Sequence, residues 1–421
     1  FQHSYKVLDE IFYSHVNPIP VAKPKMVIIN ENLAHSLNLD FSNLSGPEQA
    51  ELFSGNVLPE GAAPLAQAYA GHQFGHFTIL GDGRAHLLGE HVTPSGNSFD
   101  IQLKGSGPTP YSRNGDGRAV LGPMLREYII SEAMYALGVP STRSLAVVST
   151  GENVFRETPL PGAILTRVAT SHIRIGTFQF AAAQRDKNLL KTLLDYTIAR
   201  HEPLLKETDN PALSLLDSVI QSQSDLIANW LRIGFIHGVM NTDNVTLSGE
   251  TIDYGPCAFM DQFNPKKVFS SIDRMGRYAY ANQPKILQWN IARLAETLLP
   301  LIDENIDKSV EVANEKINGF DKIFESKYVS VMRAKLGLFG EHEEDQELYA
   351  DLTSWMHKYD KDFTNTFRDL SKERLLEQQD YQNEDFRNWY KRWKKRQEKN
   401  DIPQSSSISL MERTNPYVIP R

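Results

Sequence analysis

The stretch HGVMNTDN at residues 237–244 is followed by DYG at residues 253–255. The side chains of Asn244 and Asp253 carry hard oxygen donors, which Mg²⁺ and Mn²⁺ prefer as ligands. An aspartate in such a place can bridge a metal ion to the phosphates of a nucleotide. The two motifs together therefore predict a metal-assisted nucleotide site, although either residue alone would read as a solvated loop residue.

A small hairpin is expected between these two oxygen donors. Residues 245–247 and 251–252 read as its strands, and Ser-Gly at residues 248–249 reads as its turn. Because the strands of a hairpin bring its two ends together, Asn244 and Asp253 are expected to meet there.

The order of these residues is typical of protein kinases, in which the loop H-R-D-x-x-x-x-N precedes D-F-G. His237, Asn244 and Asp253 fall in place, but Val239 stands where kinases have the catalytic aspartate. A valine side chain can neither accept a proton nor bind a metal ion. Asp243, directly before the asparagine, is therefore the candidate for the missing base.

Composition limits the classes of protein that need to be considered. The chain has 421 residues, 41% of them hydrophobic, and a net charge of −8. This length predicts one large domain or two to three ordinary ones, and the negative charge argues against a general nucleic-acid binder. The single cysteine, Cys257, excludes an internal disulfide and fits a reducing compartment. We expect it to be a small buried side chain.

The expected fold is α+β and protein-kinase-like, with a small β-rich N-lobe and a larger helical C-lobe. Residues 1–65 are expected to form an N-terminal extension, residues 66–180 the N-lobe, and residues 181–421 the C-lobe with a C-terminal helical extension. Hydrophobic periodicity predicts the elements. Strands are expected at residues 77–80, 85–90, 99–103, 144–148 and 163–168, and helices at residues 123–137, 188–200, 211–233, 284–302 and much of 305–400.

The string GDGR occurs at residues 81–84 and again at residues 115–118. Glycine lets the backbone approach a phosphate closely, and an arginine can grip a phosphate through a forked pair of N–H groups. Most such strings are only turns. A third glycine-bearing segment, GHQFGH at residues 71–76, contains no carboxylate or cysteine to complete a metal site. It is interpreted as structural or as part of a nucleotide-pocket wall.

Two further pairs of residues extend the nucleotide hypothesis. Lys104 follows the strand expected at residues 99–103, and Glu127 lies near the start of the next helix, as in the kinase lysine–glutamate pair. Arg167 and Arg174 lie where kinases usually continue into a segment that contacts adenine. If phosphates lay beside these arginines, the nucleotide would be turned end for end and would present its α-phosphate. For an isolated arginine the ordinary interpretation is a surface salt bridge.

The chain resembles the selenoprotein O family of protein adenylyltransferases over nearly its whole length. Besides the two motifs at residues 237–244 and 253–255, several longer strings carry this resemblance. They are GHQFG at 71–75, QLKGSG at 102–107, YSR at 111–113, IDYGP at 252–256, GRYAY at 276–280, NQP at 282–284 and RTNPY at 413–417.

The resemblance implies a kinase-like fold that binds ATP in the flipped orientation and transfers AMP to Ser, Thr or Tyr hydroxyls of proteins, with release of pyrophosphate. Carried over by motif, Asp243 would be the base, Lys104 and Glu127 the ion pair, and Asn244 and Asp253 the ligands of Mg²⁺ or Mn²⁺. The nucleotide contacts would be Gly81, Gly83, Arg84, Lys104, Asp116, Gly117, Arg167, Arg174 and Asp253.

The implied partners are protein substrates, with no nucleic acid and no membrane. No charged-then-apolar leader follows Phe1, so we expect a bacterial cytoplasmic protein, or a mitochondrial one in a eukaryote. Two alternatives remain: transfer of the γ-phosphoryl group in the manner of a protein kinase, and a non-catalytic ATP-binding scaffold.

Overall fold

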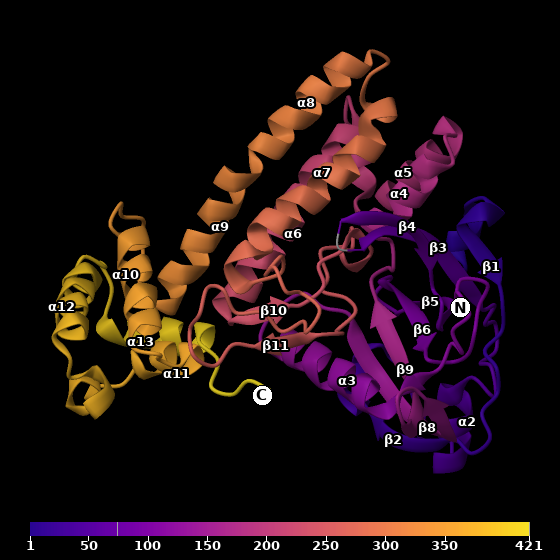
Figure 1. Cartoon of the computed structure of the whole chain (residues 1–421), viewed down its shortest axis with the longest axis horizontal. Helices are drawn as coiled ribbons and strands as arrows, with labels where there is room; N and C mark the ends of the chain where they lie inside the picture. The colour runs from indigo at the N-terminus through magenta and orange to yellow at the C-terminus, as the bar shows by residue number, and fades with distance from the viewer. Residues whose placement is uncertain (74, 421) are drawn as a thin grey trace. The chain divides into compact units, whose positions relative to one another are not determined.

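The computed structural model describes residues 1–73 and 75–420 (Figure 1), so Phe74 of the GHQFG string and the terminal Arg421 lie outside the described residues. Contacts among residues divide the chain into two units. Unit 1 comprises Phe1–Ile220, Met240–Gly255 and Trp289–Ile317, and unit 2 comprises Gln221–Val239, Pro256–Gln288 and Asn318–Arg421. The lobe borders expected at residues 65 and 180 stay a prediction.

A nine-stranded sheet forms the centre of unit 1, and all its strand pairs are antiparallel. Its order is β1-β3-β5-β6-β9-β8-β2, with β4 paired to β3 and β7 paired to β9. The five strands expected from sequence are confirmed. The bounds are β1 Tyr13–His15, β2 Lys25–Ile29, β3 Leu65–Gln73, β4 His76–Gly81, β5 Ala85–Val92, β6 Ser98–Lys104, β7 Ala119–Val120, β8 Arg143–Phe155 and β9 Pro159–Ala169.

Along the chain, the helices of unit 1 lie between the strands of this sheet and after them. The residues of α6, and likewise those of α7, are divided between the two units. The helices expected at residues 123–137, 188–200, 211–233 and 284–302 are confirmed to within a few residues. The bounds are α1 Glu31–Ser36, α2 Gly46–Ser54, α3 Leu121–Ala136, α4 Ile175–Ala183, α5 Lys187–His201, α6 Pro211–Arg232, α7 Gln283–Ile302 and α8 Ile306–Asn318, with 3₁₀ turns η1 Ser4–Val7, η2 Glu10–Phe12, η3 Pro203–Glu207 and η4 Thr242–Asn244.

The alternation of side chains along β6 and β9 separates an apolar face from a polar one. Ile101 and Leu103 of β6 belong to a hydrophobic cluster with residues of α1, α2 and β8. In the cross-strand register Gln102 pairs with Arg167 and Lys104 with Leu165, so the polar residues share the other face. Leu165 there packs with Met124 of α3. The helix therefore covers the face that carries Lys104 and Arg167.

The prediction of a hairpin at residues 245–252 is wrong. Residues 245–247 bond instead to residues 173–175, through N–H···O bonds of 2.9 and 3.0 Å. Thr251 bonds to the segment at residues 140–142, with its N–H 3.0 Å from the carbonyl oxygen of Pro140. A hairpin with such short strands is marginal by itself, and each half finds its partners elsewhere in unit 1.

Unit 2 is mainly helical and is built around aromatic side chains. Trp389 and Trp393 of α12 stack with their rings 5.6 Å apart, and both are almost fully buried. Cys257 is half-buried rather than fully buried. The bounds are β10 Phe235–His237, paired with β11 Cys257–Phe259, α9 Phe320–Lys335, α10 Asp345–Lys358, α11 Phe363–Asp369, α12 Glu384–Glu398 and α13 Gln404–Thr414, with 3₁₀ turns η5 Tyr280–Asn282, η6 Leu375–Glu377 and η7 Gln379–Tyr381.

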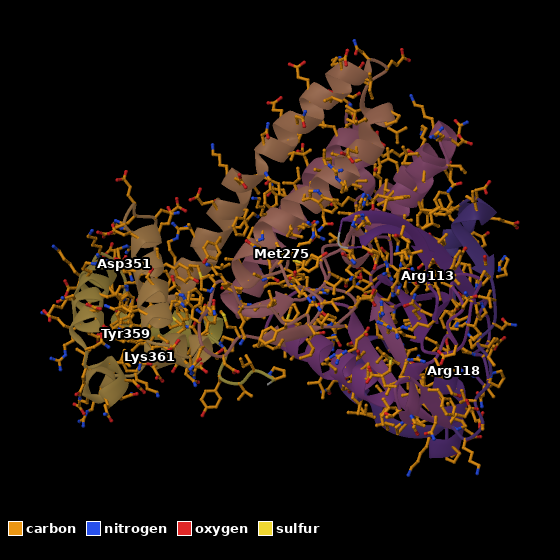
Figure 2. All side chains as sticks on the ribbon, viewed as in Figure 1. Arg113, Arg118, Met275, Asp351, Tyr359 and Lys361 are labelled. Atoms are coloured by element: carbon orange, nitrogen blue, oxygen red, sulfur yellow. The ribbon has the colours of Figure 1, made fainter. Side chains whose placement is uncertain are left out.

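Polar contacts join α10 to α12 on the surface of unit 2, where Figure 2 labels Asp351 and Tyr359. Asp351 pairs with Arg392, and the hydroxyl of Tyr359 donates to the carboxylate of Asp385 at 2.9 Å.

Across residues 1–73 and 75–420, no helix has the length and apolar character needed to span a bilayer.

Candidate active site

Lys104 and Glu127, which the sequence proposed as a pair, are in contact. Lys104 ends β6 and Glu127 lies in the second turn of α3. The ammonium Nζ of Lys104 lies 2.7 Å from Oε2 of Glu127, and the two side chains are 7% and 3% exposed. Because both charges are withdrawn from water, each needs its partner, and the pair fixes α3 against the sheet.

Three cationic side chains converge on the carboxylate of Asp253. Its Oδ1 accepts from Nζ of Lys104 at 2.6 Å and from Nη2 of Arg167 at 2.7 Å. Its Oδ2 accepts from Nη1 of Arg174 at 2.9 Å. The same Nη2 of Arg167 lies 3.1 Å from Glu127. Asp253 has a φ of +59°, a left-handed conformation that aspartate tolerates better than most residues.

The electrostatics of this cluster favour an anion. Burial alone would raise the pKa of Asp253, but Arg167, Lys104 and Arg174 hold it well below its usual range. Arg167 and Arg174 are 2% and 3% exposed. Within the described part of the chain, Nε and Nη1 of Arg167 and Nε of Arg174 have no hydrogen-bond acceptor. Buried donors of this kind are costly unless an acceptor reaches them.

Asp243 lies against β3 at the edge of the same cluster. Nε2 of Gln73 donates to its two carboxylate oxygens at 3.1 and 3.2 Å, and Nη1 of Arg174 donates to its main-chain oxygen at 2.9 Å. Burial raises the pKa of Asp243 to about 6, although Arg174 opposes the shift. A carboxylate with a raised pKa is better suited to accept a proton near neutral pH than an ordinary aspartate.

Glycine at position 71 makes room for this carboxylate. A Cβ on Gly71 would lie 2.3 Å from Oδ1 of Asp243, and one on Gly176 would lie 2.0 Å from the main-chain oxygen of Ala70. The backbones of β3 and α4 can therefore approach the Asp243 loop only where no side chain intervenes. The sequence analysis noted the glycine-bearing segment but did not connect Gly71 or Gln73 with Asp243.

The first GDGR string forms the connection between β4 and β5. A Cβ on Gly81 or Gly83 would lie within 3 Å of Tyr111, and Arg84 is exposed. Asp82, which the sequence analysis did not select, is 3% exposed; it accepts from Nε2 of Gln102 at 3.2 Å and lies 3.8 Å from Arg174. These contacts join residues that are distant in sequence, so no local pattern could have disclosed them.

The second GDGR string has different partners. The carboxylate of Asp116 pairs with Arg156 at 2.8 Å, and both side chains are more than two-fifths exposed. Gly117 has a φ of +64° and packs against Gly107 and Pro108 so closely that a Cβ would lie 2.1 Å from their backbone. No contact recorded for the described residues joins Asp116 to Asp253.

Metal ligands are few in this structure. Among residues 1–73 and 75–420, no group of three or more His, Cys, Asp or Glu side chains is placed to hold a metal ion. Asn244 ends η4 and is half-buried. The histidine at position 72 packs instead on Trp289, with its Nδ1 2.9 Å from Nε2 of Gln179, as expected of a structural residue.

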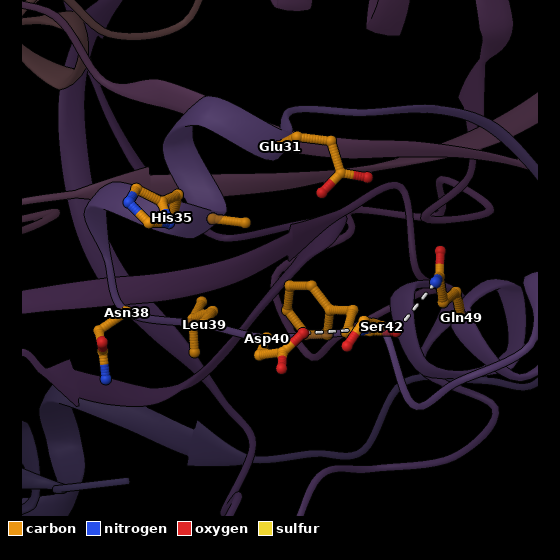
Figure 3. Close-up of a pocket in the computed structure, with 9 residues that line it drawn as sticks. Glu31, His35, Asn38, Leu39, Asp40, Ser42 and Gln49 are labelled. Atoms are coloured by element: carbon orange, nitrogen blue, oxygen red, sulfur yellow. Dashed lines mark hydrogen bonds between the residues drawn. The ribbon is translucent and has the colours of Figure 1, made fainter.

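A cavity of about 450 Å³ lies elsewhere in unit 1, between α1 and α2 (Figure 3). Glu31, His35, Asp40 and Gln49 contribute polar groups to its wall. None of the residues proposed for the nucleotide site lines this cavity, so it adds nothing to that site.

Comparison with known proteins agrees with the resemblance. The family whose sequence profile matches residues 1–421 is described as Protein adenylyltransferase SelO. The chain belongs to this family. It is 60% identical to the Protein nucleotidyltransferase YdiU of Nitrosococcus oceani and 58% identical to that of Bacillus cytotoxicus, over all of this chain and 85% and 86% of those relatives. The YdiU protein of Halalkalibacterium halodurans is also 58% identical and covered over 86% of its length.

Membership in the SelO family makes this chain a protein adenylyltransferase, a class of nucleotidyltransferase whose nucleotide substrate is ATP and whose acceptors are proteins. The three relatives named above are bacterial.

Proposed function

We propose that this adenylyltransferase binds ATP with its triphosphate reversed relative to a protein kinase and transfers AMP to Ser, Thr or Tyr hydroxyls of proteins, releasing pyrophosphate. The proposal includes a kinase-like arrangement, with residues 66–180 as the N-lobe and residues 181–421 as the helical C-lobe. It also includes a bacterial cytoplasmic location, in keeping with the source of the relatives.

The convergence of Lys104, Arg167 and Arg174 carries this proposal. Lys104 ends β6, Arg167 lies on the adjacent β9, and Arg174 directly precedes α4. Among the described residues, Asp253 is the one carboxylate that contacts all three, while Glu127 contacts Lys104 and Arg167. Arg167 and Arg174 still have buried donors without an acceptor among the described residues. A triphosphate supplies several anionic oxygens at once, which matches this set of donors better than a single carboxylate does.

The remaining nucleotide contacts are proposed from the family motifs. The turn after β4 lies beside Lys104, since Ala85 pairs with Lys104 across β5 and β6 and the N–H of Gly105 donates to the main-chain oxygen of Arg84 at 2.7 Å. The second GDGR string would contact the nucleotide away from the cationic cluster. The proposed contacts are Gly81, Gly83, Arg84, Lys104, Asp116, Gly117, Arg167, Arg174 and Asp253.

We propose that Asp253 and Asn244 hold a divalent metal ion of the kind that the family implies, once the phosphates have taken over the cations that now bond to Asp253. Asp253 offers a carboxylate and Asn244 an amide oxygen, and Mg²⁺ commonly binds one or two protein oxygens and completes its shell with phosphates and water. The sparse donor set is thus suited to a metal that arrives with its nucleotide. When bound, the ion would neutralise negative charge on the phosphates.

Asp243 is proposed as the base. Its carboxylate is held by Gln73 and would orient the incoming hydroxyl and accept its proton as the oxygen attacks the α-phosphorus. Lys104, Arg167 and Arg174 would hold the phosphates in line with that attack. The ion pair with Glu127 would keep Lys104 in place.

The direct test uses ATP labelled on the α-phosphate and, separately, on the γ-phosphate. Each is incubated with the protein, Mg²⁺ or Mn²⁺ and a bacterial extract, and label in protein is counted. We expect label from α-labelled ATP only. Asp253→Ala serves as the inactive control. Glu132→Ala serves as the matched active control, because the side chain of Glu132 bonds to Asn30, Arg143 and the N–H of Ser144 rather than to the three cations.

Label from γ-labelled ATP alone would make this chain a kinase and overturn the proposal. No label from either ATP, with ATP binding retained, would favour a non-catalytic scaffold.

A further inference from the structure

The segment between Asn244 and Asp253 contains a carboxylate that has no part in the proposed chemistry. Oε2 of Glu250 accepts hydrogen bonds from the main-chain N–H of Thr170 at 3.0 Å and from its hydroxyl at 2.6 Å. The hydroxyl of Ser248 donates to the same oxygen at 3.2 Å. One carboxylate oxygen therefore receives three donors, two of them from a single residue on another segment.

Thr170 lies between the two phosphate-gripping arginines in sequence, directly after β9. Its main-chain oxygen accepts from Nη2 of Arg200 on α5 at 2.8 Å. Arg200 is fixed in turn by the carboxylate of Asp100 on β6 at 3.0 Å. Thr170 is thus held by α5 through its main-chain oxygen. It is held by Glu250 through its main-chain N–H and its hydroxyl.

Backbone contacts join the same two segments a second time. The N–H of Ile175 donates to the oxygen of Val245 at 2.9 Å, and the N–H of Leu247 donates to the oxygen of Ile173 at 3.0 Å. The hydroxyl of Thr246 closes the turn by donating to the main-chain oxygen of Glu250 at 2.7 Å. We call these contacts between residues 170–175 and residues 245–250 the clamp. Glu250 supplies its side-chain bonds, and the backbone bonds of Ile173 and Ile175 supply the rest.

We propose that Glu250 is a positioning residue for AMP transfer. Its carboxylate fixes the segment that carries Asp243 and Asp253 against the segment that carries Arg167 and Arg174. The inference rests on the proposed function, because those four residues are its base, its metal ligand and its phosphate grips. Glu250 touches none of them and acts through the loop that joins two of them.

The clamp depends on an acceptor oxygen rather than on negative charge. Burial raises the pKa of Glu250 to about 7, with Asp100 adding to the shift and the bonds from Thr170 and Ser248 opposing it. Asp100 is paired with Arg200 at 3.0 Å, so the cation that contacts Thr170 has a partner already. A neutral amide with the same oxygen is expected to hold Thr170 nearly as well.

The test compares Glu250→Ala, Glu250→Gln and Thr170→Val in the full chain. The Ala variant removes the acceptor, the Gln variant keeps an acceptor oxygen without the charge, and the Val variant removes one of the two Thr170 donors. Glu132→Ala is the matched control, since its carboxylate on α3 accepts from Arg143 and from the N–H of Ser144 and, among the contacts of the described residues, has no bond to Glu250 or Thr170. AMP transfer, the KM for ATP and unfolding by denaturant are measured for each.

We expect Glu250→Ala to lose about 10²-fold in kcat, because misplacement of a reacting group by about 1 Å costs that much, while its KM for ATP changes only a few-fold. Glu250→Gln should stay within about threefold of the wild type in kcat, and Thr170→Val should fall between the two. Glu132→Ala should lower stability without lowering kcat per folded molecule.

Glu250→Ala with the kcat of the wild type would overturn the inference, as would Glu250→Gln as slow as Glu250→Ala. Should Glu250→Ala fail to fold, Thr170→Val and Glu250→Gln still decide, since an unchanged kcat in Thr170→Val would also count against the clamp. A wild-type protein that transfers no AMP would instead defeat the proposed function, which separates the two failures.

Discussion

Two aspartates of unit 1 are paired with arginine at nearly the same distance. Asp253 lies 2.7 Å from Arg167, and Asp116 lies 2.8 Å from Arg156. The side chains of the first pair are 22% and 2% exposed, whereas those of the second are 43% and 44% exposed. Asp253 also contacts Lys104, whereas among residues 1–73 and 75–420 the carboxylate of Asp116 pairs with the side chain of Arg156 alone.

The difference shows that contact distance alone says little about what a charge pair does. Water screens the exposed pair, so it contributes little to stability. In the buried cluster the charges are poorly solvated, so each depends on its neighbours, and removal of one leaves the others uncompensated. Of the two aspartate sites, the cluster around Asp253 is therefore the one whose poorly solvated charges suit it to a triphosphate.

The largest effect should follow Asp253→Ala. Loss of this carboxylate leaves Lys104 and Arg167 to share Glu127, and leaves Arg174 with Asp82 at 3.8 Å. Because three buried cations then have too few close partners, we expect the free energy of unfolding to fall by about 3–5 kcal/mol. AMP transfer should be lost as well. Denaturant unfolding measures the first, and labelled ATP measures the second.

Added ATP should restore part of the lost stability of Asp253→Ala, because its phosphates take the place of the carboxylate among the cations. Equal losses in Asp253→Ala and Asp116→Ala would mean that the two pairs are alike, and the comparison would fail.

The sequence predicted the parts of this cluster that are close in the chain or that belong to long motifs. Lys104 at the end of a strand and Glu127 on the next helix follow from hydrophobic periodicity and a kinase analogy, and their contact is present. Asp82 and Gln73 were missed, because their partners are distant in sequence and meet them only through tertiary packing, which periodicity does not specify.

The expected hairpin at residues 245–252 failed for a related reason. Its residues have strand-like character, but local pattern cannot say which strand they will meet. Val245 bonds to Ile175, which is distant in sequence, and Thr251 bonds to Pro140. Tertiary partners therefore overrode a local preference, as is common for short β segments.

Asp243→Asn should have the next largest effect. The amide cannot accept the hydroxyl proton, so we expect AMP transfer to fall by about 10²–10⁴-fold, the usual contribution of a general base. The bond from Gln73 can persist, because the amide keeps one acceptor oxygen, and ATP affinity should stay near that of the wild type. Single-turnover transfer and equilibrium ATP binding give the two quantities. Transfer at the wild-type rate would show that another group accepts the proton.

Gly71→Ala tests the space around the same carboxylate. The new methyl group would meet Oδ1 of Asp243 at 2.3 Å, so Asp243 must shift, and we expect a loss of about 10- to 100-fold in kcat. Gly122→Ala on α3 is the matched control, since its methyl group meets nothing within 4 Å and should leave kcat unchanged. Equal kcat values for both variants would mean that Asp243 tolerates displacement and is not the base.

The smallest effect should follow Asp116→Ala. Because its pair with Arg156 is exposed, we expect the free energy of unfolding to fall by only about 0.2–1 kcal/mol, and less at high salt. The hydrogen bond from Arg156 lowers the pKa of Asp116. This contribution is therefore present above the ordinary aspartate pKa of about 4 and is lost as the pH falls through the folded-state value.

Because Asp116 is a proposed nucleotide contact, its replacement should nevertheless raise the KM for ATP, with little change in kcat. Unfolding at low and high salt, at neutral and acidic pH, and the KM for ATP are the measurements. A salt-independent loss of stability as large as that of Asp253→Ala would show that Asp116 belongs to a desolvated network. Exposure would then be no guide to which of the two aspartates the fold depends on.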